Sequence, residues 1–399
     1  MEVLQDRYKD TKVGRIPKDW EVMMLNEITN YKSSNLSLNK LEENTGKYKL
    51  YGASGMLKGI DFYQTDKESF AIVKDGSGFG NLLWCDKNSS ILGTLGRITN
   101  KETSDLKFCF YLTHTIKFKR YMSGSTIPHL YYKDYGNIKL PVPPLPEQQK
   151  IAAILSTVDE QISTTDKIIE KSKELKKGLM QKLFSEGIGH TEFKDTKIGR
   201  VPKGWDVIKL NSIAKSFVGI ASSATHAYRD SGVLLLRNQN IKEGRLKLDD
   251  VLYVNEEYEL QHKTKRLKVN DILSVRTGYP GMSAVVTKEL EGSQSFTTLI
   301  TRINSVNIDS YYLCYFINSP EGKAFFKRSE AGGGQKNVGA GTMSKMFIPI
   351  PSLSEQQKIV AILSEADAKI EKEQTQKAQL EQLKKGLMQQ LLTGKKRVA

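Results

Sequence analysis

Two glycine turns in the chain each follow a basic residue, and both are candidates for contact with a phosphate or a base edge. The first is Val73–Gly80 (VKDGSGFG), with Lys74 near its start, and the second is Val275–Gly281 (VRTGYPG), with Arg276 in the same place. Glycine lets the backbone approach a ligand closely, so that backbone amides and a cation can face the same anion. A tight β-turn without a ligand explains the pattern about as well, and neither turn matches G-x-G-x-x-G.

Other basic residues lie close to aromatic or glycine-rich segments, and with the turns they form our set of candidate DNA contacts. One cluster precedes Tyr121, another lies in HKTKRLK (262–268), and a third stretch is AGGGQKNVGAG (331–341). Any one such cluster, taken alone, is more often a solvated surface than a binding site. The candidate DNA-binding residues are Lys74, Ser77, Lys117, Lys119, Arg120, Lys263, Lys265, Arg266, Arg276, Tyr279, Gln335 and Lys336.

The charge of the chain supports a polyanionic partner. Among 399 residues, 60 Lys and Arg stand against 45 Asp and Glu, which gives a net charge of +15 and a pI near 9.4. Residues 20–145 carry +4 and residues 205–353 carry +5, whereas residues 146–187 are neutral. The surplus therefore lies mostly in two separate segments, which we expect to grip the polyanion.

Residue patterns that would indicate catalysis or metal binding are missing. The three cysteines are far apart and lack CxxC spacing, and the five histidines are isolated. No Gly-Lys pair is followed by Ser or Thr, so there is no Walker A loop. We therefore predict no catalytic residue and no metal site, and we expect the cysteines to be buried, reduced thiols.

The chain is two copies of one unit. The string DTKVGRIPKDW (Asp10–Trp20) returns as DTKIGRVPKGW (Asp195–Trp205), and EQQKIAAILS (Glu147–Ser156) returns as EQQKIVAILS (Glu355–Ser364). Residues 147–183 and 355–391 share 19 identities over 37 aligned positions. The segments between the repeated strings show little identity, and the second of them is longer.

Helical spacing of apolar residues without an internal proline predicts a long helix over 147–184 and a second one from 355. We expect the two to pair as an antiparallel coiled coil; two ordinary bundle helices in separate domains are the alternative. The intervening segments read as mixed α+β lobes with many short strands, such as 69–74, 271–276 and 296–303. The predicted fold is thus α/β lobes alternating with two long helices in an internal pseudo-twofold repeat. The predicted domains are a lead-in (1–19), a first lobe (20–145), a first long helix (146–187), a repeated lead-in (188–204), a second lobe (205–353), and a second long helix with a basic tail (354–399).

The PLPEQQKIA helix start, its repeat PSLSEQQKIV and the G-R-[IV]-P-x-x-W lead-in resemble the specificity subunits of type I restriction-modification systems. The resemblance covers almost the whole chain; Ser352 and Ser354 replace prolines of the first copy. It implies that each lobe is a target recognition domain for one half of a bipartite double-stranded DNA sequence, and that the helices set the separation of the halves. It also implies a non-catalytic chain that docks two adenine-modifying methyltransferase subunits, with restriction subunits in the full complex.

The resemblance further implies that S-adenosylmethionine, ATP and Mg are bound by partner subunits, with no cofactor on this chain. We assign partner docking to the two helix starts. The candidate partner-binding residues are Gln148, Gln149, Ile151, Leu155, Gln356, Gln357, Ile359 and Leu363. The polar N-terminus and the lack of a long apolar run predict a cytoplasmic protein without a membrane partner. The alternative is a stand-alone DNA-binding regulator, or an orphan recognition module without a methyltransferase partner.

Overall fold

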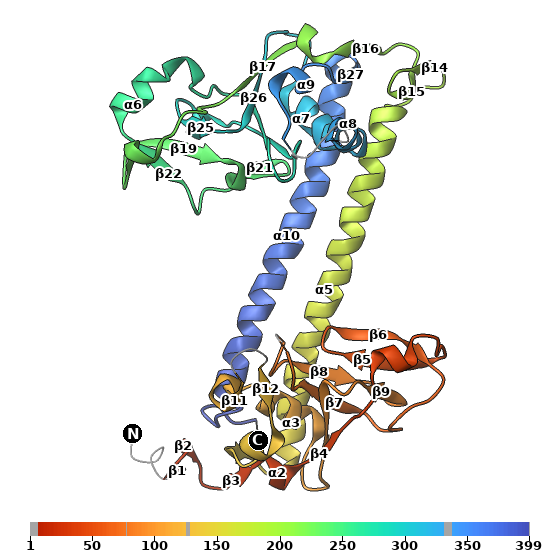
Figure 1. Ribbon diagram of the computed structural model, residues 1–399, viewed down its shortest axis with the longest axis vertical. Coiled ribbons are helices and arrows are strands. Elements are labelled where there is room, and N and C mark those ends of the chain that lie inside the picture. The colour runs from red at the N-terminus through yellow and green to blue at the C-terminus, as the bar shows by residue number, and fades with distance from the viewer. Residues whose placement is uncertain (1–6, 77, 125–127, 331–336, 399) are drawn as a thin grey trace. The chain divides into compact units, whose positions relative to one another are not determined.

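The computed structural model describes residues 7–76, 78–124, 128–330 and 337–398, and the chain divides into two compact units. The first unit combines residues 1–166 with 375–399, and the second consists of residues 167–374. The division crosses both long helices, α5 (Leu145–Ser185) and α10 (Leu353–Leu391) (Figure 1). Each unit therefore holds one lobe together with part of both helices. Within the described residues, no helix is both long and apolar enough to cross a membrane.

The first lobe is built on a four-stranded antiparallel sheet in the order β4-β10-β7-β8, beside a three-stranded sheet in the order β6-β5-β9. Its strands are β1 (Tyr8–Thr11), β2 (Gly14–Pro17), β3 (Glu21–Met24), β4 (Thr29–Ser33), β5 (Tyr48–Gly52), β6 (Gly55–Ile60), β7 (Ser69–Val73), β8 (Leu82–Cys85), β9 (Ser89–Ile91), β10 (Leu95–Asn100), β11 (Met122–Ser123), β12 (His129–Leu130) and β13 (Lys139–Val142). Its helices are α2 (Leu25–Ile28), η1 (Leu38–Leu41), α3 (Leu106–Thr113), η2 (Phe118–Tyr121) and α4 (Tyr132–Tyr135).

The second lobe repeats this plan, with a four-stranded antiparallel sheet in the order β17-β26-β23-β24 and a second sheet in the order β18-β22-β19-β25. Its strands, with the lead-in, are β14 (Phe193–Thr196), β15 (Gly199–Pro202), β16 (Asp206–Lys209), β17 (Ala214–Val218), β18 (Tyr228–Arg229), β19 (Val233–Arg237), β20 (Ile241–Lys242), β21 (Arg245–Leu246), β22 (Leu252–Val254), β23 (Ile272–Ser274), β24 (Ser283–Val285), β25 (Gln294–Phe296), β26 (Leu299–Ile303) and β27 (Phe347–Ile350). Its helices are η3 (Leu210–Ser212), η4 (Thr225–Ala227), η5 (Asn238–Asn240), α6 (Glu256–Gln261), η6 (Lys263–Lys265), η7 (Lys288–Leu290), α7 (Ser310–Asn318), α8 (Pro320–Glu330) and α9 (Ala340–Met343).

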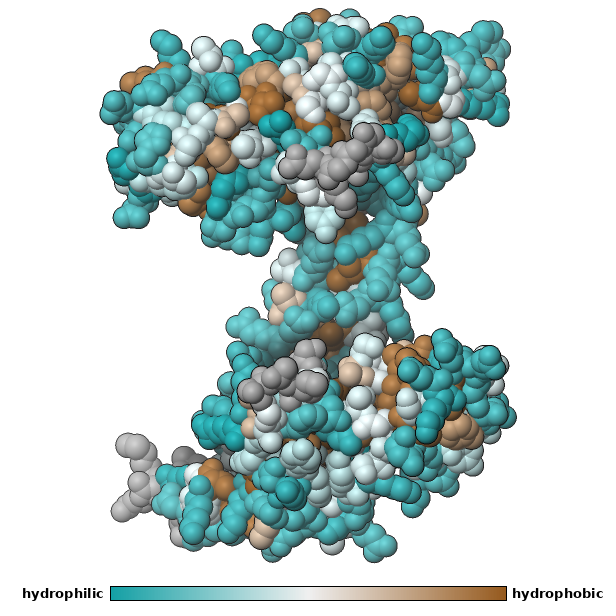
Figure 2. All heavy atoms as spheres, in the orientation of Figure 1, coloured by the Kyte–Doolittle hydropathy of each residue, from teal (hydrophilic) through white to brown (hydrophobic). Residues whose placement is uncertain are grey.

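The prediction of mixed lobes alternating with two long, antiparallel helices is confirmed. In the first unit, Lys377 on α10 lies 2.7 Å from Asp166 on α5, and Lys384, seven residues further on, lies 2.6 Å from Asp159, seven residues back. In the second unit, Lys176 on α5 lies 2.6 Å from Asp367 on α10. In the first unit, seven residues toward the C-terminus of α10 correspond to seven residues toward the N-terminus of α5, so the two helices run antiparallel. Figure 2 shows mainly hydrophilic residues on the visible surface of the lobes and helices.

Each lobe closes its core around a lead-in tryptophan and a long helix. Trp20 and Trp205 are almost fully buried, and the indole Nε1 of each donates a 3.0 Å hydrogen bond to the glutamate that opens the repeated helix motif, Glu147 or Glu355. A buried tryptophan removes a large apolar surface from water, and such burial is the main source of stability for each lobe. The lead-in and the helix start therefore recur together because they are in direct contact.

Candidate nucleic-acid interface

The two glycine turns are equivalent hairpin connections in the two lobes. The first joins β7 to β8 and the second joins β23 to β24. Gly76 and Gly80 have φ of +90° and +82°, and Gly278 and Gly281 have φ of +86° and +91°. Side chains with a Cβ rarely adopt such angles, so the turns require glycine at these positions.

A segment from further along the chain supports each turn. The backbone N–H of Leu130 donates to the carbonyl of Lys74 at 2.8 Å, and the N–H of Val338 donates to the carbonyl of Arg276 at 3.0 Å. Lys74 and Arg276 therefore occupy equivalent positions, as their places in the sequence pattern predicted. Ser77, Gln335 and Lys336 lie outside the described residues.

A phenylalanine packs beneath the last glycine of each turn. A Cβ on Gly80 would lie 3.0 Å from the Cβ of Phe118, and a Cβ on Gly281 would collide with the ring of Phe326. Both phenylalanines are buried. Each one is therefore a fixed support that places the residues following it beside the turn.

Those following residues are a Lys-Arg pair in both lobes: Lys119 and Arg120 in the first, Lys327 and Arg328 in the second. All four side chains are exposed. The Phe-Lys-Arg string recurs 208 positions apart, the same offset that relates the two EQQKI helix starts. Sequence reasoning selected the first pair and missed the second, because three matching letters inside otherwise unlike lobes do not stand out.

We name these groups the first turn cluster (Lys74, Lys119 and Arg120) and the second turn cluster (Arg276, Lys327 and Arg328). Within the described part of the chain, none of the six forms an ion pair with an acidic residue. Each cluster therefore offers unneutralised positive charge to an anion.

The second cluster carries two further features suited to DNA. The side-chain oxygen of Asn238 accepts a 3.1 Å hydrogen bond from the Arg276 N–H, and its amide donates to the hydroxyl of Thr277. Nε of Arg276 is buried and has no hydrogen-bond partner among the residues that the structure describes. Tyr279, at the tip of the turn, is 79% exposed. Asn238 therefore holds the turn in place, a role that the sequence did not reveal, while Tyr279 presents an aromatic ring to solvent.

Two predicted DNA contacts, Lys265 and Arg266, also have hydrogen-bond partners inside the second lobe, and their assignment to DNA stays a prediction. Arg266 donates two 2.6 Å hydrogen bonds to Glu259, whose side chain is buried. Nζ of Lys265 donates to the carbonyl of Gly219 at 2.9 Å. These two side chains stabilise the second lobe. Lys117 and Lys263 are exposed, and their assignment stays a prediction.

The assignment of six predicted partner-binding residues needs correction, because their side chains are buried in their own unit. Gln148 accepts from the N–H of Asp105 and donates to the carbonyl of Pro143, both at 2.9 Å. Gln356 makes the equivalent bonds with Asp309 and Pro351. The buried set is Gln148, Ile151, Leu155, Gln356, Ile359 and Leu363. These residues dock each lobe on its long helix.

The repeated positions that remain exposed belong to another part of each helix surface. Gln149 and Gln357 are exposed, and their assignment to partner binding stays a prediction. Leu175 and Leu383, identical across the repeat, are 61% and 50% exposed. We name the exposed identical positions the repeated helix surface; they are Gln149, Lys150, Ala153, Leu383, Lys385 and Gln389 in the first unit, and Gln357, Lys358, Ala361, Leu175, Lys177 and Gln181 in the second.

The cysteines are buried thiols, as the sequence indicated. Cys85, Cys109 and Cys314 are unpaired, and burial raises the pKa of each to about 12. They stay protonated at neutral pH and cannot serve as thiolate nucleophiles. Among the described residues, no group of three His, Cys, Asp or Glu side chains is placed to hold a metal ion.

Two unlike lobes with equivalent cationic turns, joined to repeated helices, define a two-lobed nucleic-acid reader. The family model described as "Type I restriction modification DNA specificity domain" matches residues 17–174 and 202–382. The chain belongs to this family, and it is a DNA sequence-recognition subunit of the type I restriction-modification class.

Individual relatives agree with this assignment. The MjaVIII specificity subunit of Methanocaldococcus jannaschii is 31% identical over 99% of this chain and 97% of its own length. The EcoBI specificity subunit of Escherichia coli is 23% identical over 75% of this chain and 66% of its own length. The S subunit of M. genitalium has the same fold, with a TM-score of 0.63, 17% identity, and coverage of 94% of this chain and 96% of that one. A stand-alone DNA-binding regulator is therefore not favoured.

Proposed function

We propose that each lobe reads one half of a bipartite DNA target, with its turn cluster at the DNA surface. The observation that carries this proposal is the recurrence of the same support, Phe-Lys-Arg beneath a glycine turn, in lobes that otherwise share little sequence. Lysine and arginine bind phosphates, and arginine also reads base edges in the major groove. Because Lys74 stands where the second lobe has Arg276, and Tyr279 lies only in the second turn, the two halves of the target should differ.

The repeated helix surface supports assembly with two modification subunits, one on each unit. Core packing does not explain why exposed residues are identical in both units. Binding of two copies of one partner, one to each unit, would explain it. The family's restriction subunits would join this assembly to form the full complex. S-adenosylmethionine, ATP and Mg would bind to those partner subunits, while this chain contributes sequence recognition.

The test is a pair of double substitutions in the complex assembled with modification subunits. K119A/R120A removes two cations from the first turn cluster, and K327A/R328A removes the matching two from the second. Removal of one phosphate contact lowers the slope of log affinity against log salt by about 0.9. We therefore expect either double variant to lower the magnitude of that slope by about 2 and to weaken binding most at low salt.

The matched control is K167A/K171A, which removes two exposed lysines of α5 that lie outside both lobes. It carries the same change in net charge and should leave the slope near the wild-type value. Equal slopes for the control and both turn variants would contradict the proposed interface.

A further inference from the structure

Each unit contains a Tyr-Asp-Lys triad where a lobe helix meets both long helices. In the first unit, the hydroxyl of Tyr111 donates to Oδ2 of Asp159 at 2.7 Å, and Nζ of Lys384 lies 2.6 Å from Oδ1 of the same carboxylate. The second unit repeats this with Tyr315, Asp367 and Lys176, at 2.8 and 2.6 Å. In both units the lysine Nζ lies 5.5 Å from the centre of the tyrosine ring.

Three different elements meet at each triad, which we call a joint. The tyrosine comes from the lobe, on α3 or α7. The aspartate comes from the long helix that follows that lobe, and the lysine comes from the other long helix. A rotation of the lobe against either helix would break at least one of the contacts, so the joint fixes the lobe in one orientation within its unit.

Burial strengthens both joints. The side chain of Lys176 is only 10% exposed and that of Lys384 is 25% exposed. Burial, reinforced by the nearby aspartate, raises the pKa of Tyr111 and of Tyr315, so both hydroxyls stay protonated and able to donate. A hydrogen bond from a hydroxyl to a carboxylate is charge-assisted and stronger than one between neutral groups.

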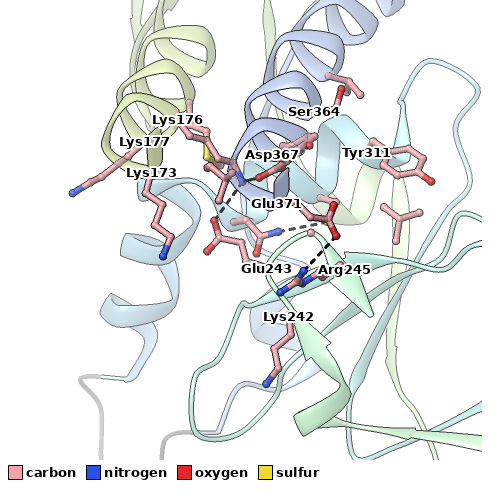
Figure 3. A pocket seen from close by; sticks show the side chains of 18 of the residues that line it. Lys173, Lys176, Lys177, Lys242, Glu243, Arg245, Tyr311, Ser364, Asp367 and Glu371 are labelled. Atoms are coloured by element: carbon pink, nitrogen blue, oxygen red, sulfur yellow. Dashed lines mark hydrogen bonds and ion pairs between the residues drawn. The ribbon is translucent and has the colours of Figure 1, made fainter. Parts of the chain in front are cut away.

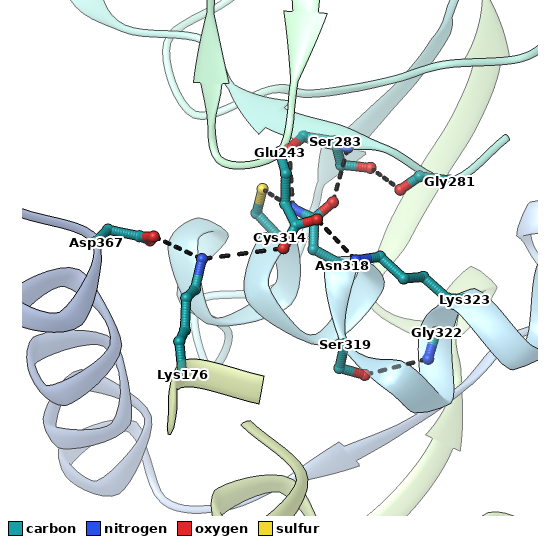
Figure 4. A network of polar contacts seen from close by, with 10 residues as sticks. All are labelled: Lys176, Glu243, Gly281, Ser283, Cys314, Asn318, Ser319, Gly322, Lys323 and Asp367. Carbon is teal, nitrogen blue, oxygen red and sulfur yellow. Dashed lines mark hydrogen bonds and ion pairs between the residues drawn. The ribbon is translucent and has the colours of Figure 1, made fainter. Parts of the chain in front are cut away.

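The second joint is extended by a hairpin of its own lobe, the one formed by β20 and β21. Figure 4 shows Glu243, in this hairpin, facing Lys176; its carboxylate lies 3.9 Å from that lysine and 2.7 Å from Nζ of Lys323 on α8. Arg245 of the same hairpin lies 3.7 Å from Glu371 on α10 (Figure 3). The hairpin and the helices border a cavity of about 860 Å³. Contacts around this cavity tie the second lobe to α10 at more than one point.

We propose that Asp159 and Asp367 are positioning residues that hold each lobe at one orientation on the paired helices, and thereby restrict the spacing of half-sites that the protein accepts. This inference rests on the proposed function. One added base pair moves a half-site by about 3.4 Å and rotates it by roughly 35° about the DNA axis. A lobe fixed to both long helices cannot follow that movement, whereas a lobe with a loosened joint can.

The experiment uses the complex with modification subunits and a set of DNA targets whose spacer is the natural length, one base pair shorter or one longer. The variants are D159N and Y111F for the first joint, and D367N and Y315F for the second. D166N is the matched control, because Asp166 pairs with Lys377 between the same two helices in the same register. The measured quantity is the methylation rate on each altered spacer relative to the natural one.

Each joint variant should raise that ratio by about tenfold, the effect of removing one hydrogen bond to a charged group, and D166N should leave it unchanged. A uniform fall in rate on all three spacers, with an unchanged ratio, would mean that the joints serve folding only and would overturn the inference. Since the Tyr→Phe variants remove a single hydroxyl, they decide the matter if the aspartate variants fail to fold. Failure of the proposed function would look different: the wild-type complex itself would then show no bipartite target.

Discussion

Replacing Arg397 with alanine should destabilise the first unit by about 3 kcal/mol. Arg397 donates two 2.8 Å hydrogen bonds to Glu147 and two more to Asp19, at 2.8 and 2.7 Å. The Glu147 side chain is only 6% exposed, whereas that of Asp19 is 50% exposed. The two halves of this ion cluster therefore differ in what they contribute.

Removing one partner of a buried ion pair costs about 3–5 kcal/mol, because the other charge stays buried and unpaired. An exposed pair contributes only about 0–1 kcal/mol. Arg397 is itself one-third exposed and Glu147 keeps its bond from Trp20, so the total belongs at the lower end of the buried range. For a unit of about 190 residues, a loss of ~3 kcal/mol lowers Tm by roughly 6–12 °C.

Differential scanning calorimetry of the purified chain measures this change. K395A is the control, since Lys395 is exposed two positions away. Adding E147Q to R397A should recover part of the loss, because the second change removes the unpaired buried charge. The reasoning is refuted if R397A melts within about 2 °C of the wild type, or if E147Q destabilises the R397A protein further.

Three smaller predictions concern Glu147, Tyr279 and Gly281. Burial alone would raise the pKa of Glu147, but hydrogen bonds from Arg397 and Trp20 outweigh burial and lower the pKa. The ionised Glu147 therefore stabilises the first unit fully above about pH 4.3, and this stabilisation is lost as the pH falls further. When Tm is measured against pH in the acid range, Tm should fall less steeply in R397A than in the wild type. Y279A should weaken discrimination by the second lobe by about 1–3 kcal/mol for each base pair that Tyr279 reads and leave the first half-site unchanged, as measured by competition binding. G281A should destabilise the second unit, because its Cβ meets the Phe326 ring at a positive φ, and thermal melting checks this.

Most of the fold could be predicted from the repeated strings. The helix over 147–184 was predicted almost to its ends, because heptad spacing without proline depends only on local sequence. The antiparallel direction followed from the need for each lobe to return the chain to the next repeat. Asp159 and Lys384 then set the register, which the apolar pattern alone could not supply.

For the residues at the two helix starts, the sequence alone could not predict which side chains are buried in their own unit. Periodicity identifies a conspicuous helix face, but it does not tell whether a lobe or a partner protein covers that face. Gln148 is polar, so it suggested a surface contact; it is buried because its amide satisfies the N–H of Asp105 and the carbonyl of Pro143. That geometry comes from a segment more than forty positions away in the chain.

The sequence predicted only some residues of the two turn clusters, because the others are brought to the turn by packing between distant segments. Lys74 and Arg276 share a strand-turn pattern that can be read locally. Lys327 and Arg328 became candidates only through the packing of Phe326 beneath Gly281, since loops of unequal length separate the turn from the Phe-Lys-Arg string in the two lobes.

Exchange of the first lobe tests the central claim most directly. Residues 20–145 would be replaced by the corresponding lobe of a family member with a different known target, and methylated sites would be mapped by sequencing in cells carrying the full system. We expect one half of the recognised sequence to change while the other half and the spacer length stay as they were. A change in both halves, from a complex that still assembles, would contradict the account of two independent readers.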